Sequence, residues 1–456
     1  MNNFESDTLL HPSSERIAMG RALRDEVPRQ AHTDWQPRPD RRDVIGILEE
    51  SNLGRVPDLI PIRYGRMLAN PFAFLRGSAA LMAYDLAATP TSGIRVQACG
   101  DCHLANFGLF ATPERNLVFD LNDFDETLPA PWEWDVKRLA ASFVVAGRAN
   151  RLADRSNEAA VRVLARSYRT HLREYAKMRV LDVWYSRLDD KMLIDSAPNV
   201  EAREYRKRVA AKARASIAEY LFPKITDLKD GHRRIVDKPP LMYHLPEQSD
   251  TEERLHKILA AYRDSLPAHL HKLFNHYRFE DYAFKVVGVG SVGTRCFAVL
   301  FMADSDDPLL LQAKEARPSV LEPYAEASKF DHHGQRIVVG QRLMQSASDM
   351  FLGWMTGGDG THYYMRQLRD MKFSIPLDAF EAQGLARYAE VCGWVLARAH
   401  AKGGDAALIS GYLGKSDAFD QALGKFALAY ADQTEKDHAA LVNAVESGRL
   451  QARLDS

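Results

Sequence analysis

Apolar positions recur at helical spacing along most of the chain and at strand spacing in one late region. Helical spacing predicts helices at residues 43–50, 71–86, 135–150 and 391–404, and in several stretches between 155 and 275. Alternating or β-branched runs predict strands at residues 94–98, 283–289, 294–302, 309–316, 336–344 and 362–368. The pattern predicts an α+β protein whose helical body carries one β-rich module.

This pattern divides the chain into four segments. Residues 1–60 are polar and interrupted by prolines, so we expect an N-terminal arm. Residues 61–280 are expected to form a helical lobe and residues 281–373 a β-rich lobe. Residues 374–456 are expected to supply helices that complete the helical lobe. The basic run at 203–216 surrounds an alanine-rich stripe, which favours a solvated helix face over an anion-binding surface.

Composition is that of an ordinary globular protein. The 456 residues include 60 Lys and Arg and 61 Asp and Glu, for a formal charge of −1, and 46% are hydrophobic. These values exclude disordered, collagen-like and disulfide-scaffold classes, and they argue against a nucleic-acid partner. The start lacks a basic-apolar leader and no apolar stretch reaches about eighteen residues, so we expect no membrane partner. Because only four cysteines occur, we predict a cytoplasmic protein.

Two acidic clusters lie close together, GDCHLAN at residues 100–106 and FDLNDFDE at residues 119–126. They supply five carboxylates, two asparagines and a histidine among apolar residues. Buried carboxylates are costly unless they are paired or hydrogen-bonded. Hard oxygen ligands suit Mg²⁺ or Mn²⁺ better than zinc. Asp and Asn are also common turn residues, but this density of acids between apolar residues favours a functional site.

Motifs along nearly the whole chain resemble one bacterial family. The segment from about residue 63 to 148 and the motifs VGVGSVGTR, QAKEARPSV, GQRLMQSASDMFLGW, ARAHAKGGD and GYLGKSDAFD resemble the domain-of-unknown-function family numbered 2252. That family carries no established activity. The resemblance therefore implies a relationship and no function.

A second resemblance concerns the acidic clusters alone. Residues 100–106 are similar to the catalytic loop Gly-Asp-x-His-x-x-Asn of protein-kinase-like phosphotransferases of the aminoglycoside and choline kinase type. In those proteins an Asp-Phe-Asp motif follows at a strand end, and residues 123–125 match it. An aspartate then opens a helix, as Asp135 does here. Cys99 stands where the family often has His or Tyr.

The second resemblance implies roles for individual residues. Asp101 would be the catalytic base for an acceptor hydroxyl, and His103 a structural member of the same catalytic loop. Asn106 and Asp123 would hold Mg²⁺ on the phosphates of ATP. Asp125, like Asp120, is an alternative or second-metal ligand.

A candidate for the phosphate-binding half of such a site lies in the β-rich region. A glycine loop joins the first two predicted strands and contains Gly288, Gly290, Ser291 and Gly293. Glycines let backbone N–H groups approach phosphates, and kinase glycine loops occupy this hairpin context. Lys314 on the next strand stands where a kinase has its phosphate-contacting lysine, and Glu322 or Glu326 is a candidate to pair with it. The alternative is a plain glycine-rich hairpin with an exposed lysine.

The order of these parts is unusual, because the glycine loop follows the catalytic loop. This order leaves two interpretations, a circularly permuted two-lobed kinase-like fold or a coincidental similarity. The first requires Lys314 to lie within about 15 Å of Asp123, so that one triphosphate bridges them.

Other residues near the clusters have possible roles. Arg63 and Arg76 are candidates to neutralise carboxylates or to contact phosphate. Cys99 and Cys102 are a weaker candidate for a zinc or redox site, because the chain has no second CxxC pair.

The sequence thus favours a Mg²⁺- and ATP-dependent phosphotransferase acting on an unidentified hydroxyl acceptor. One alternative is a divalent-metal phosphohydrolase that uses Asp101, His103, Asp120 and Asp123. The other is a non-catalytic nucleotide-binding scaffold.

Overall fold

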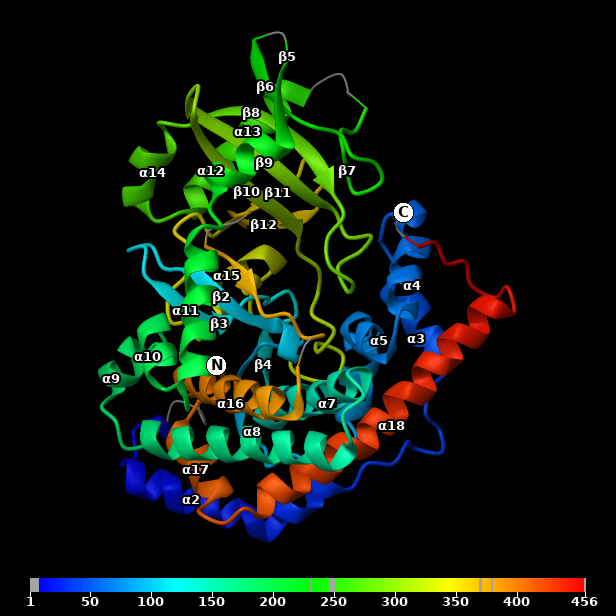
Figure 1. Cartoon of the computed structure of the whole chain (residues 1–456), viewed down its shortest axis with the longest axis vertical. Helices are drawn as coiled ribbons and strands as arrows, with labels where there is room; N and C mark the ends of the chain where they lie inside the picture. Colours follow the sequence, from blue (N-terminus) through cyan, green and yellow to red (C-terminus); the bar gives the residue numbers. More distant parts are fainter. Residues whose placement is uncertain (1–7, 230, 247–250, 369–370, 379, 455–456) are drawn as a thin grey trace.

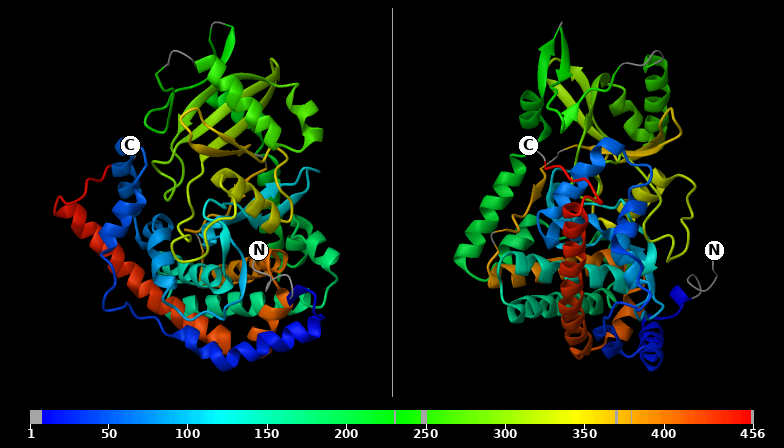
Figure 2. Two further views of the ribbon diagram at one scale, coloured as in Figure 1. Left: turned by 180° about the vertical axis from the view of Figure 1, so that it is seen from behind. Right: turned by 90° about the vertical axis from the view of Figure 1, so that its right-hand side faces the viewer.

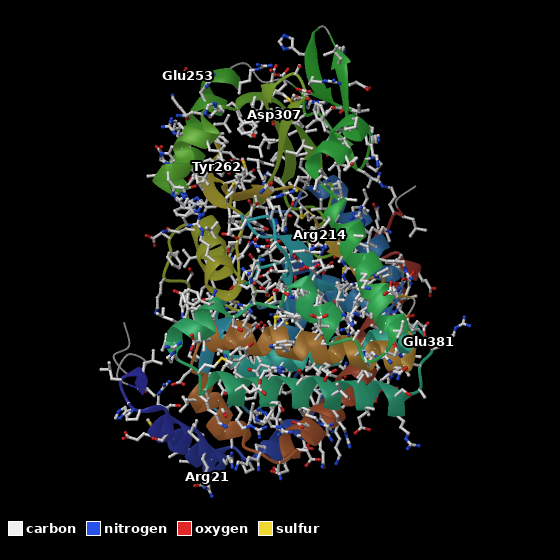
Figure 3. All side chains as sticks on the ribbon, turned by 60° about the vertical axis from the view of Figure 1, so that its left-hand side comes forward. Arg21, Arg214, Glu253, Tyr262, Asp307 and Glu381 are labelled. Atoms are coloured by element: carbon white, nitrogen blue, oxygen red, sulfur yellow. The ribbon has the colours of Figure 1, made fainter. Side chains whose placement is uncertain are left out.

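The computed structural model describes residues 8–229, 231–246, 251–368, 371–378 and 380–454. A β-rich small lobe lies at one end and a larger helical lobe at the other (Figure 1). In Figure 3, Asp307 marks the small lobe, and Arg21 lies at the opposite end. The α+β class predicted from the sequence is confirmed.

A six-stranded antiparallel sheet forms the small lobe, in the order β11-β12-β10-β9-β8-β7. Its strands are β7 (Met242–Tyr243), β8 (Arg278–Lys285), β9 (Cys296–Asp304), β10 (Asp307–Glu315), β11 (Gly353–Thr356) and β12 (His362–Gln367). Around it lie α12 (Ala218–Ile225), β5 (Thr226–Lys229), β6 (His232–Ile235), α13 (Thr251–Ser265), α14 (Ala268–Phe274) and α15 (His333–Met344). The sheet thus draws on residues before 281.

The two faces of β10 have different surroundings, because successive side chains of a strand point to opposite sides. Leu309 and Leu311 pack in a cluster with Tyr262 of α13. Leu310 packs on the other face with Phe222 of α12. Lys314, four residues after Leu310, therefore lies on the face away from α13.

The strand expected at residues 336–344 is wrong, because these residues form helix α15. The β-branched pair Val338-Val339 suggested a strand, but Ile337, Gln341 and Met344 are buried at helical spacing. The side chain of His332 accepts a hydrogen bond from the Gln335 backbone N–H and caps the helix. The expected strand at 362–368 is confirmed as β12.

Long helices build the other lobe: α7 (Trp132–Ala149), α8 (Asp154–Tyr175), α16 (Ala382–Gly403), α17 (Ala406–Leu413) and α18 (Ala418–Glu446). They come from both sides of the small lobe in the sequence. Helices α8 and α16 pack closely, and a Cβ on Gly393 of α16 would lie 2.4 Å from the Leu164 carbonyl oxygen of α8. Glycine at position 393 permits this approach.

The N-terminal segment follows the outside of the helical lobe (Figure 2). It contains α2 (Ser13–Glu26), η1 (Arg29–Thr33), α3 (Val44–Ser51), η2 (Pro57–Leu59) and α4 (Ile60–Leu68). Helix α2 packs on α17, and the buried imidazole of His32 hydrogen-bonds with the Tyr412 hydroxyl at 2.7 Å. Near the other end of the described chain, the Arg453 N–H donates to the Pro61 carbonyl.

The acidic clusters lie within a series of short elements between the lobes. These elements are α5 (Pro71–Gly77), α6 (Ala79–Leu86), β1 (Arg95–Ala98), η3 (Leu104–Asn106), β2 (Phe107–Ala111), β3 (Leu117–Leu121) and β4 (Leu128–Pro131). The single helix expected over 71–86 is divided at Ser78 into α5 and α6. Strand β1 pairs with β4, whereas β2 and β3 form a hairpin that β13 (Phe373–Ser374) extends.

The connection from the helical to the small lobe contains α9 (Val180–Tyr185), α10 (Asp190–Asp195) and α11 (Val200–Arg214). Helix α11 carries the basic run and contacts β2 and β13. In the described part of the chain, no helix combines the length and apolar character needed to cross a membrane.

Candidate functional site

Asp135, near the start of α7, holds the beginning of the GDCHLAN loop. Its two carboxylate oxygens accept hydrogen bonds from the backbone N–H groups of Cys99, at 2.7 Å, and Gly100, at 2.9 Å. His400 of α16 lies 3.2 Å from the same carboxylate. Gly100 has φ +85°, and a Cβ there would lie 2.3 Å from the Glu126 carbonyl oxygen. The loop conformation is therefore fixed by α7 and by the second acidic cluster.

Asp101, the expected base, is held by an arginine that the sequence analysis did not identify. Arg138 of α7 donates from Nε to Asp101 Oδ1 at 2.6 Å, and from another nitrogen to the Leu75 carbonyl at 2.9 Å. The Arg138 side chain is 2% exposed, whereas that of Asp101 is 26% exposed. The carboxylate is thus oriented from the buried side and open on the other. Its partner was missed because an Arg on an apolar helix has no sequence signal for a loop 37 residues away.

Asn106 joins the two acidic clusters. Its Oδ1 accepts from the Asp123 N–H at 2.6 Å, and its Nδ2 donates to the Asp123 carbonyl at 2.9 Å. These bonds use the amide oxygen that the kinase resemblance assigns to a metal. In this conformation Asn106 is a bridge between backbone segments.

Lys314 of β10 contacts the second acidic cluster. Its Nζ lies 2.5 Å from Asp125 Oδ2 and 3.4 Å from Asp123 Oδ1. The Tyr364 hydroxyl of β12 donates to the other Asp125 oxygen at 2.5 Å. The distance between Lys314 and Asp123 is well within the limit of about 15 Å that a shared triphosphate sets.

Several cations set the charge state of this cluster. Partial burial acts to raise the pKa of Asp123, but Lys314, Arg366 and Lys372 outweigh it and hold that pKa below its usual value. Burial likewise opposes the charged form of Lys314, whereas Asp123 and Asp125 raise its pKa well above the usual value. Both partners are therefore charged. Arg366 also donates to the Asn122 carbonyl at 2.8 Å.

The glycine loop packs against the segment from α3 to α5. The Gly293 carbonyl accepts from the Val56 N–H at 2.8 Å, and a Cβ on Gly290 would lie 2.9 Å from the Arg76 carbonyl oxygen. Gly288 has φ +66° and Gly293 φ +88°, which other residues rarely adopt. Within the described chain, the backbone N–H groups of residues 289–291 have no backbone acceptor. Ser291 accepts, through its carbonyl, from the Thr294 N–H at 3.2 Å.

Arg336 of α15 fixes the end of the second acidic cluster and was also missed. It donates to the carbonyls of Asp125, at 2.8 Å, and Thr127, at 2.5 Å. The carboxylate of Glu126, the residue between Asp125 and Thr127, accepts a hydrogen bond from the Val320 N–H at 2.7 Å. Burial raises the pKa of the Glu126 carboxyl to about 7, although the Val320 bond and Arg336 oppose this.

Two expected pairings are wrong. Lys314 does not pair with Glu322 or Glu326, because its ion pairs are with Asp123 and Asp125. Glu326 is instead an exposed side chain 3.8 Å from Arg95. Arg63 bonds the Asn52 side chain and the Gly77 carbonyl and neutralises none of the acids of the two clusters.

The hydrogen-bond partners of Asp120 differ from those of Asp101 and Asp123. It is fully buried and accepts from Arg398, at 2.7 Å, and from the Ser346 hydroxyl, at 2.7 Å. These bonds make it a structural anchor between β3, α15 and α16. The phosphohydrolase alternative needs this residue at a metal.

His103 and Cys102 are buried close to the catalytic loop. Burial lowers the pKa of His103 to about 4, so the imidazole is neutral near pH 7, and its Nδ1 has no hydrogen-bond partner. Burial raises the pKa of the Cys102 thiol well above its usual value. This disfavours the thiolate that a zinc or redox site requires.

The side chains of the two acidic clusters do not form a complete metal site by themselves. Among the described residues, no three His, Cys, Asp or Glu side chains converge closely enough to hold an ion. Asp123 is 47% exposed and fits a hard-cation ligand, but Asn106 and Asp125 are engaged within the protein. A bound Mg²⁺ would therefore take much of its coordination from a ligand, as Mg²⁺ on nucleotides usually does.

Two cavities are lined by residues of the small sheet. One of about 250 Å³ is lined from both lobes and includes Asn122, Arg366 and Lys372, the neighbours of Asp123. Another of about 450 Å³ is lined by Tyr282, Phe297 and other residues on the α13 side of the sheet. Because Lys314 lies on the opposite face, the larger cavity lies on the other side of the sheet from the contact between Lys314 and the acids.

Fold and site together define a two-lobed α+β protein whose small sheet contributes a lysine to an acidic centre on the helical lobe. The chain belongs to the family described as an uncharacterized protein conserved in bacteria, domain of unknown function 2252, whose model matches residues 55–444. The family resemblance noted in the sequence is thereby confirmed. Comparisons with curated proteins and with solved structures returned no match.

Proposed function

We propose that this protein binds ATP with Mg²⁺ and transfers the γ-phosphoryl group to a hydroxyl of an unidentified small-molecule or protein acceptor in the cytoplasm. The observation that carries the proposal is the contact of Lys314 with Asp123 and Asp125. This contact joins a lysine beside a glycine loop to the carboxylates of the acidic segment. A bound triphosphate requires both halves at one place.

The order of parts in the small sheet supports a kinase-like assignment. In protein kinases a glycine loop covers the phosphates, and the phosphate-contacting lysine is on the third strand. Here the loop joins β8 and β9, Lys314 lies on β10, and helix α15 follows. The helical lobe draws on both ends of the chain, so a kinase-like fold would be circularly permuted, which packing tolerates.

The chemistry follows from the geometry of Asp101. Held by Arg138, it would accept the proton of the attacking hydroxyl. The bond between the γ-phosphorus and the oxygen of the ADP leaving group breaks, and its electron pair leaves with ADP. A new phosphorus–oxygen bond forms to the acceptor. Lys314 and the free N–H groups of residues 289–291 would bind phosphate oxygens.

Asp123 is the residue best suited to hold Mg²⁺, which would neutralise phosphate charge when bound. Asn106 and Asp125 would join it only after exchanging their present partners. Because Asn106 and Asp125 bond other groups of the protein, one second candidate is favoured, a nucleotide-binding scaffold without turnover. The buried pairing of Asp120 with Arg398 counts against the phosphohydrolase.

Thermal unfolding of the full chain with Mg·ATP tests the proposal. Ligand that binds only the native state stabilises it, by about 2.7 kcal/mol at one hundred times Kd. We expect a raised Tm for the wild type and no shift for Lys314→Met. Lys329→Met, which alters an exposed lysine of the same lobe, is the control and should respond as the wild type does.

Failure of Mg·ATP to shift the wild-type Tm would contradict the proposal. Stabilisation by Mg²⁺ alone would point to the hydrolase. Full ATP binding in Asp101→Asn, with no wild-type transfer to any acceptor, would point to the scaffold.

A further inference from the structure

Arg76 differs from the other arginines around the acidic centre. The others bond carbonyl or carboxylate oxygens: Arg63, Arg138, Arg336, Arg366 and Arg398. Within the described chain, Arg76 makes no ion pair and no side-chain hydrogen bond. Its Nε is buried without an acceptor. Its guanidinium carbon lies over the Phe72 ring, 5.9 Å from the ring centroid.

Arg76 lies where the glycine loop meets the acidic centre. Its carbonyl oxygen would lie 2.9 Å from a Cβ on Gly290, so the glycine loop passes directly over it. Burial lowers its pKa, and the charges of Asp101 and Asp123 raise it, so both carboxylates are near enough to act on the guanidinium. The same Phe72 ring contacts His103, whose Nδ1 is also unpartnered, with 6.4 Å between ring centroids.

The Arg76 side chain is half-buried, and its Nε is buried without an acceptor, which costs free energy. An arginine fork is built to bind two oxygens of a carboxylate or phosphate. Asp101 does not satisfy it, because Arg138 already holds that carboxylate. An oxyanion placed between the glycine loop and Asp123 would supply the missing acceptors.

We propose that Arg76 binds the terminal phosphoryl group of the triphosphate and acts as a catalytic arginine supplied by the helical lobe. This inference rests on the proposed function and deepens it. Its fork would contact the oxygens of the transferred group beside Asp101, where charge is distributed as transfer proceeds. Lys314 and the glycine loop would hold the inner phosphates. Because ADP lacks the terminal group, Arg76 distinguishes ATP from ADP.

Equilibrium titration of the full chain with Mg·ATP and with Mg·ADP tests this role. For Arg76→Gln we expect the Kd for ATP to rise about ten-fold or more while that for ADP changes less than about three-fold. Arg76→Lys should recover part of the ATP affinity. Arg95→Gln, which alters a paired arginine on β1, should leave both affinities unchanged. Because Arg76 has no hydrogen bond or ion pair to lose, the urea midpoint of Arg76→Gln should equal or exceed that of the wild type.

The outcomes separate the two proposals. Equal ATP and ADP affinities in Arg76→Gln and wild type would overturn the role of Arg76 while leaving nucleotide binding intact. Equal weakening of both nucleotides with a lowered urea midpoint would make Arg76 structural and also overturn it. If the wild type binds no nucleotide, the proposed function fails. In that case, titration with inorganic pyrophosphate tests whether Arg76 binds anions. If Arg76→Gln does not abolish pyrophosphate binding, Arg76 is no anion site either.

Discussion

Lys314 Nζ and Asp125 Oδ2 lie 2.5 Å apart, although 189 residues separate them in the chain. Tyr364 donates to the other oxygen of the same carboxylate, so one aspartate ties β10 and β12 to the acidic segment. Burial opposes the charged form of Lys314, but the neighbouring carboxylates of Asp123 and Asp125 hold the pKa of the lysine well above its usual value. A phosphate that binds Lys314 competes with Asp125 for the charge of the lysine. The pair is therefore the point at which ligand binding and the contact between the lobes are coupled.

Removing the charge of Asp125 should free Lys314 for anions. In EDTA, where no metal contributes, we expect Asp125→Asn to bind inorganic pyrophosphate several-fold more tightly than the wild type, because the competing carboxylate is gone. Tyr364→Phe keeps that carboxylate and is the control. Calorimetric titration measures the change. Weaker binding by Asp125→Asn would mean that Lys314 is not the anion contact.

Replacing Asp120 should affect folding. Asp120→Asn leaves Arg398 buried without its counter-charge, so we expect the free energy of unfolding to fall by about 3–5 kcal/mol in urea. The double variant Asp120→Leu/Arg398→Met removes both charges and should recover most of that loss. Wild-type stability in Asp120→Asn would show that the pair is not an anchor.

A methyl group on Gly290 should disturb the glycine loop. The added Cβ would meet the Arg76 backbone oxygen at 2.9 Å, which cannot move as a side-chain end can. We expect Gly290→Ala to weaken Mg·ATP binding about ten-fold, measured by titration, with a loss of about 1 kcal/mol or less in stability. Gly46→Ala, in helix α3, makes only an ordinary contact at 3.7 Å and should bind as the wild type does. Unchanged affinity in Gly290→Ala would place the triphosphate elsewhere.

His32 should make the protein sensitive to mild acid. Burial lowers its pKa from 6.5 to about 3, so between these values the unfolded chain binds the proton and the folded protein does not. Its contribution to the free energy of unfolding is thus constant above about pH 7 and falls below pH 6.5, by up to about 1.4 kcal/mol per pH unit. Urea denaturation of wild type and His32→Gln at pH 7.5 and 5.0 isolates this term.

The difference in stability between these two proteins should shrink by about 2 kcal/mol at the lower pH. Glu126 has a raised pKa of about 7 and opposes the acid effect in both proteins, so it cancels in the difference. A difference independent of pH would contradict the assignment of His32.

The sequence predicted those parts of the fold whose periodicity is local. The strands around the glycine loop are short β-rich runs bounded by turn residues, and the structure has them as β8, β9 and β10. Residues 336–344 were mistaken for a strand because β-branched residues lie in a short helix whose cap is a histidine. The kinase resemblance predicted that Lys314 pairs with a glutamate, whereas in the structure it pairs with Asp125. Arg138 and Arg336 gave no local signal, since each acts on residues distant in the sequence.

The most direct test of the account is a crystal structure of the protein with Mg²⁺ and a non-hydrolysable ATP analogue. We expect the triphosphate between residues 288–293 and Asp123, with Lys314 moved from Asp125 to a phosphate and the Arg76 fork on the terminal group. A nucleotide bound in the cavity of about 450 Å³ behind the sheet, with Lys314 still on Asp125, would contradict the central claim.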